Sequence, residues 1–186
     1  LISVMLKNGA YLINKEQADK LASIVLVEKT DKKGNVRKIV NRDCVGRDAK
    51  VLLAKLGIQV GNDIRCIICE TDANHLFVQE ELMMPILPIV RVDNIDEAIE
   101  LAVKAEHGNR HSAHIHSKNV DHLTRFAKAV ETTIFVKNAP SYAGIGAGGE
   151  GYTTFTIAGP TGEGLTAAHS FTRSRRCVMV DGLHIV

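Results

Sequence analysis

The stretch ILPIVRVDNIDEAIELAVKAEHGNRHSAHIHSKNVDHLTRFAKAVETTIFV, residues 86–136, decides the fold class of this chain. Its apolar pattern changes repeatedly between a continuous run and a helical stripe, and Asn94 with Glu97 has the spacing of a helix-capping pair. The expected order is strand, helix, strand, helix, strand, over residues 86–92, 94–103, 112–116, 120–130 and 132–136. Strands that alternate with helices are usually parallel and joined by crossover helices. The sequence therefore predicts an α/β fold with a mostly parallel sheet.

The residues before this stretch continue the same alternation. Asn14 and Gln17 form a capping box at the start of an expected helix. The charged residues 29–35 are expected to form an exposed loop, residues 47–56 a helix that ends at Gly57, and residues 64–69 a strand covered on both faces.

Composition limits the classes of function. The 186 residues include 45% apolar ones, which is enough for a sizeable core, and the net charge of +2 gives no reason to expect nucleic acid as the main partner. No apolar run is long enough to cross a membrane, so no membrane partner is expected. Four cysteines without a disulfide framework indicate a reducing, cytoplasmic setting.

Glycine is concentrated in NAPSYAGIGAGGEGYTTFTIAGPTGEG, residues 138–164. The spacing G-x-G-x-x-G occurs twice between Gly144 and Gly151, but a dinucleotide-binding fingerprint must open a helix. Here the glycines lead into residues 152–157, whose β-branched and aromatic side chains predict a strand. A loop between strands is therefore expected in place of a Rossmann turn.

Two cysteine motifs are candidates for chemistry. Cys66 and Cys69 form a C-x-x-C, but residues three apart on a strand point to opposite faces, so both are expected to fill the core. Cys44 lies between Arg42 and Arg47, which would stabilise a thiolate. A nucleophilic role for Cys44 stays open beside a structural one.

Other polar clusters have weaker signals. His107, His111, His114 and His116 lie within ten residues, and a surface or capping role is expected because no carboxylate or cysteine completes a metal site. No metal is therefore predicted.

The basic cluster Arg173, Arg175 and Arg176 fits phosphate contacts, and equally a solvated face or a salt bridge between subunits.

The chain as a whole resembles the CoA-acylating aldehyde dehydrogenases that act on propionaldehyde, acetaldehyde and butyraldehyde. The resemblance rests on EELMMPILPIVRV (80–92), EHGNRHSAHIHSKN (106–119), the glycine-rich block within 132–164 and RSRRCVMVDG (173–182). It implies an aldehyde dehydrogenase catalytic-domain fold, with residues 1–186 forming the C-terminal, substrate-side domain.

The resemblance also implies a reaction. A cysteine thiolate attacks the aldehyde, NAD accepts a hydride, and coenzyme A takes the acyl group from the thioester. The matching nucleophile would lie upstream of Leu1, together with most of the NAD-binding domain. No residue of this chain is then catalytic, and the chain alone is expected to be inactive.

Several site residues follow from the resemblance. Glu81 matches the glutamate of the superfamily motif E-x-F-G-P, which contacts the nicotinamide ribose, although Met83 and Met84 replace the Phe and Gly. The aldehyde pocket is expected to include the four residues Pro140, Ser141, Tyr142 and Ile145.

The family is oligomeric through C-terminal strands, so a strand over residues 176–180 is expected to pair with a second copy in a homo-oligomer. A bacterial cytoplasmic location is expected, with a bacterial microcompartment as a further possibility. The alternative to an enzyme part is a non-catalytic assembly module with the same fold.

Overall fold

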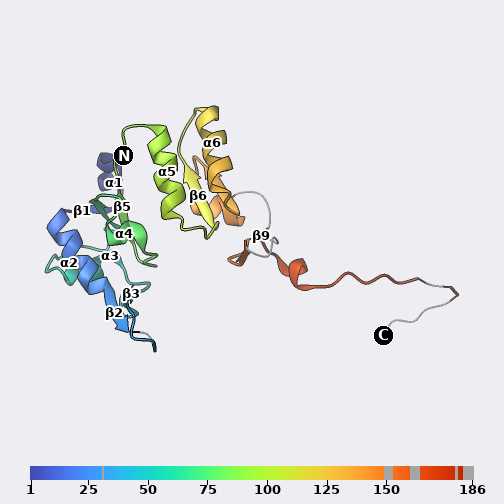
Figure 1. Ribbon diagram of the computed structural model, residues 1–186, viewed down its shortest axis with the longest axis horizontal. Coiled ribbons are helices and arrows are strands. Elements are labelled where there is room, and N and C mark those ends of the chain that lie inside the picture. Colours follow the sequence, from blue (N-terminus) through green and yellow to red (C-terminus); the bar gives the residue numbers. More distant parts are fainter. Residues whose placement is uncertain (31, 149–152, 160–163, 179, 182–186) are drawn as a thin grey trace. The chain divides into compact units, whose positions relative to one another are not determined.

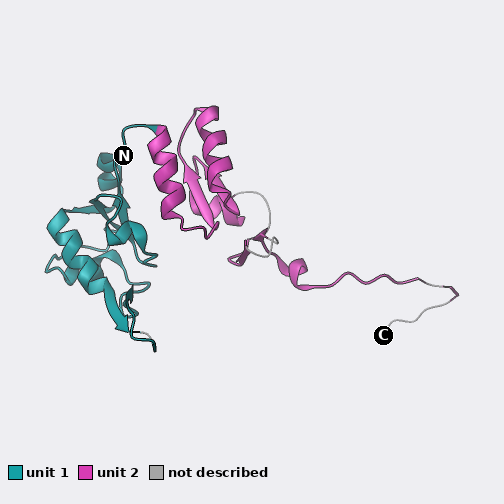
Figure 2. Ribbon diagram, in the orientation of Figure 1, with its two compact units in different colours: residues 1–94 teal, residues 95–186 magenta. Residues whose placement is uncertain are grey.

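The computed structural model describes residues 1–30, 32–148, 153–159, 164–178 and 180–181 (Figure 1). The chain divides into two compact units, Leu1–Asn94 and Ile95–Val186 (Figure 2). Helices alternate with parallel strands in both units. The predicted α/β class is therefore confirmed.

Unit 1 is built on a three-stranded parallel sheet with the order β1-β4-β5. Its elements are α1 (Ile2–Lys7), β1 (Ala10–Ile13), α2 (Lys15–Val25), β2 (Leu26–Thr30), β3 (Val36–Val40), α3 (Ala49–Ala54), β4 (Cys66–Glu70), α4 (Leu76–Gln79) and β5 (Ile86–Ile89). The central strand β4 begins two residues later than expected. Ile67, Ile68 and Cys69 in β4 are fully buried, as expected of a strand covered on both faces.

Two turns in unit 1 explain where the first elements begin and end. The Asn14 side chain accepts a hydrogen bond from the Gln17 backbone N–H, and the Gln17 side chain accepts one from the Asn14 N–H, both at 2.9 Å. This capping box starts α2 as predicted. Gly9 ends the turn after α1 with φ +86°, and a Cβ there would lie 2.6 Å from the Asp63 carbonyl oxygen, so only glycine fits.

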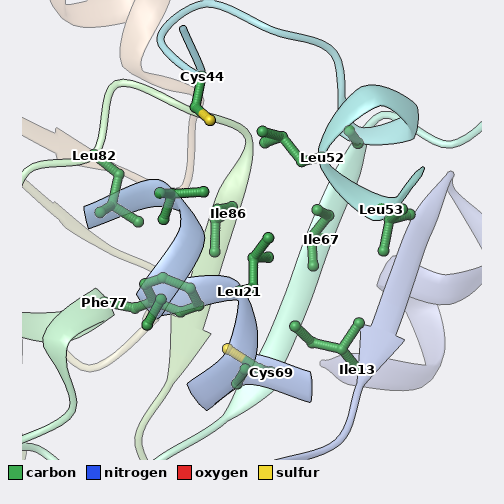
Figure 3. Packing of buried hydrophobic residues seen from close by; sticks show 14 of the residues in the cluster. Ile13, Leu21, Cys44, Leu52, Leu53, Ile67, Cys69, Phe77, Leu82 and Ile86 are labelled. Atoms are coloured by element: carbon green, nitrogen blue, oxygen red, sulfur yellow. The ribbon is translucent and has the colours of Figure 1, made fainter. Parts of the chain in front are cut away.

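The core of unit 1 consists of side chains from its helices α2, α3 and α4 and from its strands β1, β4 and β5 (Figure 3). Leu21 of α2 points toward Ile67 of β4 and Ile86 of β5, and Leu52 and Leu53 of α3 complete the contact. Burial of each such side chain stabilises the fold by about 1.5–3 kcal/mol. Packing of α2 and α3 against the sheet therefore holds the unit together.

The exposed loop expected over residues 29–35 is confirmed for residues 32–35, which form the exposed turn of a hairpin, and is wrong for residues 29 and 30, which end β2; residue 31 is not described. Strands β2 and β3 form this antiparallel hairpin, with Leu26 opposite Val40 and Thr30 opposite Val36. The hairpin is largely exposed, so its side chains lack the alternation between buried and polar positions that marks a strand in sequence.

Unit 2 begins with α5 (Ile95–Ala105), β6 (Ser112–Ile115), α6 (Val120–Val130) and β7 (Ile134–Lys137). Strands β6 and β7 pair in parallel, and α6 spans the predicted residues. The Asn119 side chain caps α6 by accepting from the backbone of Asp121 and His122. Phe126 of α6 packs edge-on against Phe135 of β7, with ring centroids 5.7 Å apart. The helix therefore covers the two strands that it connects.

The rest of unit 2 contains little regular structure in its described residues: η1 (Ser141–Ile145), the short antiparallel pair β8 (Ile157–Ala158) and β9 (Gly164–Leu165), and η2 (Ala168–Phe171). The strand expected over 152–157 is wrong for 153–156, and residue 152 lies outside the described residues. The strand expected over 176–180 is absent at 176–178 and 180, and residue 179 is not described. Among the described residues, neither 153–156 nor 176–178 pairs through its backbone with a neighbouring strand, and a strand requires such a partner.

Candidate active-site segments

The first candidate segment follows β7 in unit 2 and brings a serine to a histidine. Ala113 of β6 is buried, so His114 points to the opposite face of the strand and is only half-buried. Ser141 starts η1, and its Oγ lies 3.3 Å from His114 Nε2. Among the described residues no side chain hydrogen-bonds the other ring nitrogen of His114. The pair therefore lacks the orienting group of a catalytic triad.

Gly144 fixes η1 against the sheet. A Cβ built on Gly144 would meet Cγ2 of Ile134 and would lie 3.0 Å from Cγ2 of Val136, and both of these side chains are 5% exposed. The backbone of η1 therefore lies directly on β7. This glycine serves close packing, which positions Ser141 beside His114.

The other predicted pocket residues lie next to Ser141 in the same segment. Pro140 is the N-cap of η1 and its carbonyl accepts from the Ala143 N–H at 3.0 Å. Tyr142 is 64% exposed, and Ile145 is half-buried with its carbonyl accepting from the Thr154 N–H. All four residues belong to one short segment, but their role in an aldehyde pocket stays a prediction.

The second candidate segment is the loop between α4 and β5 in unit 1. Leu82 is buried in the core and Met84 packs against it, whereas Glu81 and Met83 are exposed. Met83 adopts φ +53°, and its carbonyl accepts from the Gly46 N–H at 3.1 Å. Leu82 thus anchors the loop and presents the Glu81 carboxylate to solvent. That position is compatible with binding a ribose, although the contact itself stays a prediction.

This loop borders a cleft of about 830 Å³. Met83, Met84 and Pro85 line one part of it, and the start of α3 with Arg65 lines another. Sequence reasoning missed the cleft, because its polar residues come from positions 46–50, 62–65 and 83–85, which no single motif connects.

The cysteines lie in three environments. Cys44 and Cys69 are fully buried in the core, and Cys66 is half-buried. Burial raises the pKa of Cys69 to about 11, with a smaller contribution from Cys66, and burial also raises the pKa of Cys66. The predicted core filling is therefore confirmed for Cys69 and not for Cys66, which lies outside the core cluster, and Cys44 has no access to a substrate. Cys177 is exposed.

Arg173, Arg175 and Arg176 are exposed and lie outside helices and strands, so phosphate binding there stays a prediction. Within the described residues, no three His, Cys, Asp or Glu side chains are grouped so that they could hold a metal ion. The described helices include none long and apolar enough to cross a membrane.

Comparison with known proteins finds one family. The model of the aldehyde dehydrogenase family matches residues 12–173. The acetaldehyde dehydrogenase (acetylating) EutE of Salmonella typhimurium is 48% identical over 186 residues, which is 100% of this chain and 39% of the relative. The chain thus spans about two fifths of the length of that curated relative.

Solved structures give the same result. A propionaldehyde dehydrogenase from the Clostridium phytofermentans fucose utilisation bacterial microcompartment is 58% identical, with a TM-score of 0.83 over 98% of this chain and 40% of that chain. A Rhodopseudomonas palustris propionaldehyde dehydrogenase with bound CoA and an acylated cysteine is 55% identical, with a TM-score of 0.85 over 96% of this chain and 39% of that chain.

Proposed function

This chain belongs to the aldehyde dehydrogenase family, and from that premise we propose that it is part of an NAD-dependent, CoA-acylating aldehyde dehydrogenase. The parent enzyme converts a short-chain aldehyde to its acyl-CoA. The observation that supports this proposal is the similarity over the whole chain to an acetylating relative and to a relative with bound CoA and an acylated cysteine. NAD supplies the hydride acceptor when it is bound.

The nucleophilic cysteine of the reaction belongs to the parent protein outside this chain. An acyl-forming thiolate must be accessible and ionised near neutral pH. Cys44 and Cys69 are fully buried, and burial keeps the Cys66 thiol protonated by raising its pKa. Cys177 is exposed but lies in a stretch without helix or strand, so nothing rigid positions it. We therefore expect no dehydrogenase activity from this chain alone.

Glu81 contributes to cofactor binding. Its carboxylate can accept hydrogen bonds from two ribose hydroxyls at once, and the buried Leu82 beside it keeps the loop in place. The η1 segment contributes the substrate side: Ser141, held at His114, and the exposed Tyr142 form part of the wall of the aldehyde pocket.

The proposed setting is the bacterial cytoplasm, where the parent enzyme acts as a homo-oligomer. A bacterial microcompartment is the narrower location, because one similar structure comes from a fucose utilisation microcompartment. Light scattering on the purified protein measures the oligomeric state. A strictly monomeric protein would contradict that part of the proposal.

A hybrid enzyme tests the activity. The C-terminal part of the acetylating relative that matches this chain is replaced by this chain, and NADH formation from acetaldehyde or propionaldehyde is followed with and without CoA. We expect CoA-dependent NADH formation by the hybrid and none by the chain alone. A folded, oligomeric hybrid without activity would contradict the proposal, and turnover by the isolated chain would contradict the placement of the nucleophile.

The same hybrid tests Glu81 against its neighbour. Glu81→Gln removes the charge that accepts from the ribose, so KM for NAD should rise about tenfold, the expected cost of one charge-assisted hydrogen bond. Glu80→Gln is the matched control, because Glu80 is also exposed and lies one residue away. Equal effects of the two substitutions would remove Glu81 from the cofactor site.

A further inference from the structure

His75 is a buried histidine that takes no part in the proposed chemistry. Its side chain is 8% exposed, and it lies immediately before α4, the short helix that leads into the loop with Glu81. Its Nδ1 accepts a hydrogen bond from the Phe77 N–H at 3.1 Å, and its Nε2 lies 3.3 Å from Asp19 Oδ1 in α2. The ring therefore joins two helices that lie far apart in the sequence.

These two contacts define the tautomer of the neutral ring. A backbone N–H can only donate, so Nδ1 of His75 must be without a proton where it caps α4. The one N–H proton of the neutral imidazole then lies on Nε2, which donates it to the Asp19 carboxylate. Both nitrogens are thus in use, and neither is left to act as a base on a substrate.

The cap fixes the start of α4, and α4 leads directly into the loop with Glu81. The Leu76 carbonyl accepts from the Glu80 N–H at 3.0 Å, so the turn that His75 caps extends to the residue before Glu81. Beyond Glu81 the loop is held by Leu82, which is buried in the core (Figure 3). The backbone at Glu81 is therefore held from one side by the capped turn and from the other by a buried side chain.

Protonation of His75 would break one of its two contacts and keep the other. A proton on Nδ1 turns this atom from an acceptor into a donor that faces a second donor, the Phe77 N–H, so the cap of α4 is lost. The Nε2–H stays on Asp19, and the charge on the ring strengthens that contact. Among the described residues Asp19 is the one ionisable side chain that pairs with the ring, and the nearest ionisable residues along the chain, Asp72 and Glu80, are exposed. The protonated ring therefore stays bound to α2 and releases α4.

We propose that His75 is a positioning residue: its neutral form caps α4 and holds the loop over residues 80–85, and protonation loosens that loop. Histidine changes charge between about pH 5 and pH 8, so the loop is held at the upper end of this range and loosened at the lower end. The consequence for the reaction rests on the proposed function, in which the loop presents Glu81 to the nicotinamide ribose. His75 touches neither cofactor nor substrate and acts only through Glu81.

Nuclear magnetic resonance of this chain tests the capping directly. At about pH 8 the imidazole nitrogen signals of His75 should show the Nε2–H tautomer. The protection factor of the Phe77 amide, which corrects for the intrinsic pH dependence of hydrogen exchange, should fall about fivefold or more as the pH is lowered to about 5. His75→Asn keeps a side-chain acceptor at the N-cap but cannot be protonated, so its Phe77 protection should stay constant over this range. His116→Asn is the matched control, because it removes an exposed histidine from unit 2 and should leave the fall unchanged.

Two results of this experiment would overturn the proposal. The first is a Phe77 amide whose protection is independent of pH in the unmodified chain, or falls equally in His75→Asn. The second is a neutral His75 ring with its proton on Nδ1, since that ring cannot accept from Phe77.

The hybrid enzyme tests whether His75 acts through Glu81. At about pH 8, His75→Ala should raise KM for NAD about fivefold with kcat changed by less than about twofold, and His75→Asn should keep KM close to that of the unmodified hybrid. In the Glu81→Gln background, His75→Ala should raise KM for NAD no further, because the contact that His75 positions is already gone. A further rise of the same size in that background would overturn the positioning role. An inactive hybrid would contradict the proposed function alone, because hydrogen exchange at Phe77 does not depend on activity.

Discussion

Replacement of Gly144 by alanine is the sharpest perturbation of the candidate substrate-side segment. The added methyl group would collide with Cγ2 of Ile134 and approach Cγ2 of Val136 at 3.0 Å, and both neighbours are too deeply buried to turn toward solvent. Overpacking of this kind costs about 1–3 kcal/mol. Gly144 is not among the residues with positive φ, so alanine also gains about 0.4–1 kcal/mol by restricting the unfolded chain. The two terms leave about 0–2.6 kcal/mol, and because the added Cβ meets two buried methyl groups at once, we expect a net loss in the upper part of that range, about 1–2 kcal/mol.

Amide hydrogen exchange measures the loss of stability of Gly144→Ala in unit 2 itself. The Ile134 amide donates to the His111 carbonyl at 3.0 Å, so its exchange rate reports opening of β7 in unit 2. Exchange at Ile134 should accelerate about fivefold to thirtyfold in Gly144→Ala, while exchange in unit 1, for example at Ile67, should stay unchanged. An effect below about 0.5 kcal/mol would refute the close packing of η1 on β7, since this is the range of neutral surface changes.

A double variant separates the collision from other effects. Ile134→Leu keeps the side-chain volume but moves the branch one carbon outward, so the Cγ2 methyl that faces Gly144 disappears. We expect Ile134→Leu to reduce the cost of Gly144→Ala, with an interaction energy of about 0.5–1 kcal/mol. Strict additivity of the two changes would show that this methyl group is not the obstacle.

Two further predictions concern unit 1. Asn14→Ala removes the capping box of α2 and should lower the free energy of unfolding by about 1 kcal/mol in urea titrations, whereas Asn8→Ala, outside the box, should cost less. The pKa of Cys69 is raised to about 11 by burial, so its contribution to stability is fully present below pH 9 and is lost as the pH rises toward 11. Denaturation midpoints should fall over that range and fall less in Cys69→Ala, and at pH 8 a thiol reagent should label Cys177 before Cys69.

The elements that sequence predicts well are those whose signal is local. The α6 helix covers the predicted residues because Asn119 caps it and its apolar residues recur on one face, and both are properties of the helix itself. The same holds for the Asn14 capping box. Each of these signals lies within the helix that it predicts, together with its N-cap residue.

Strands depend on partners, and sequence predicts them less well. Residues 153–156 are β-branched and aromatic but pair with no described strand. The charged β2–β3 hairpin, in contrast, forms because the backbone of Leu26 to Thr30 pairs with that of Val36 to Val40. In the hairpin Lys29 lies opposite Arg37, a like-charge pair that a local rule would count against a strand. Backbone pairing between the two strands outweighs that side-chain repulsion. A short stretch of sequence contains only one of the two strands, so it shows neither the pairing nor the repulsion.

The candidate sites depend even more on contacts between residues that are distant in the sequence. The segment with Ser141 is indicated by resemblance, yet its contact with His114 joins residues 27 positions apart and exists because Gly144 allows η1 to lie on β7. The cleft in unit 1 has no sequence motif at all, because its lining residues come from positions 46–50, 62–65 and 83–85. Chemistry that needs several charges at one point is therefore encoded in the packing of the sheet.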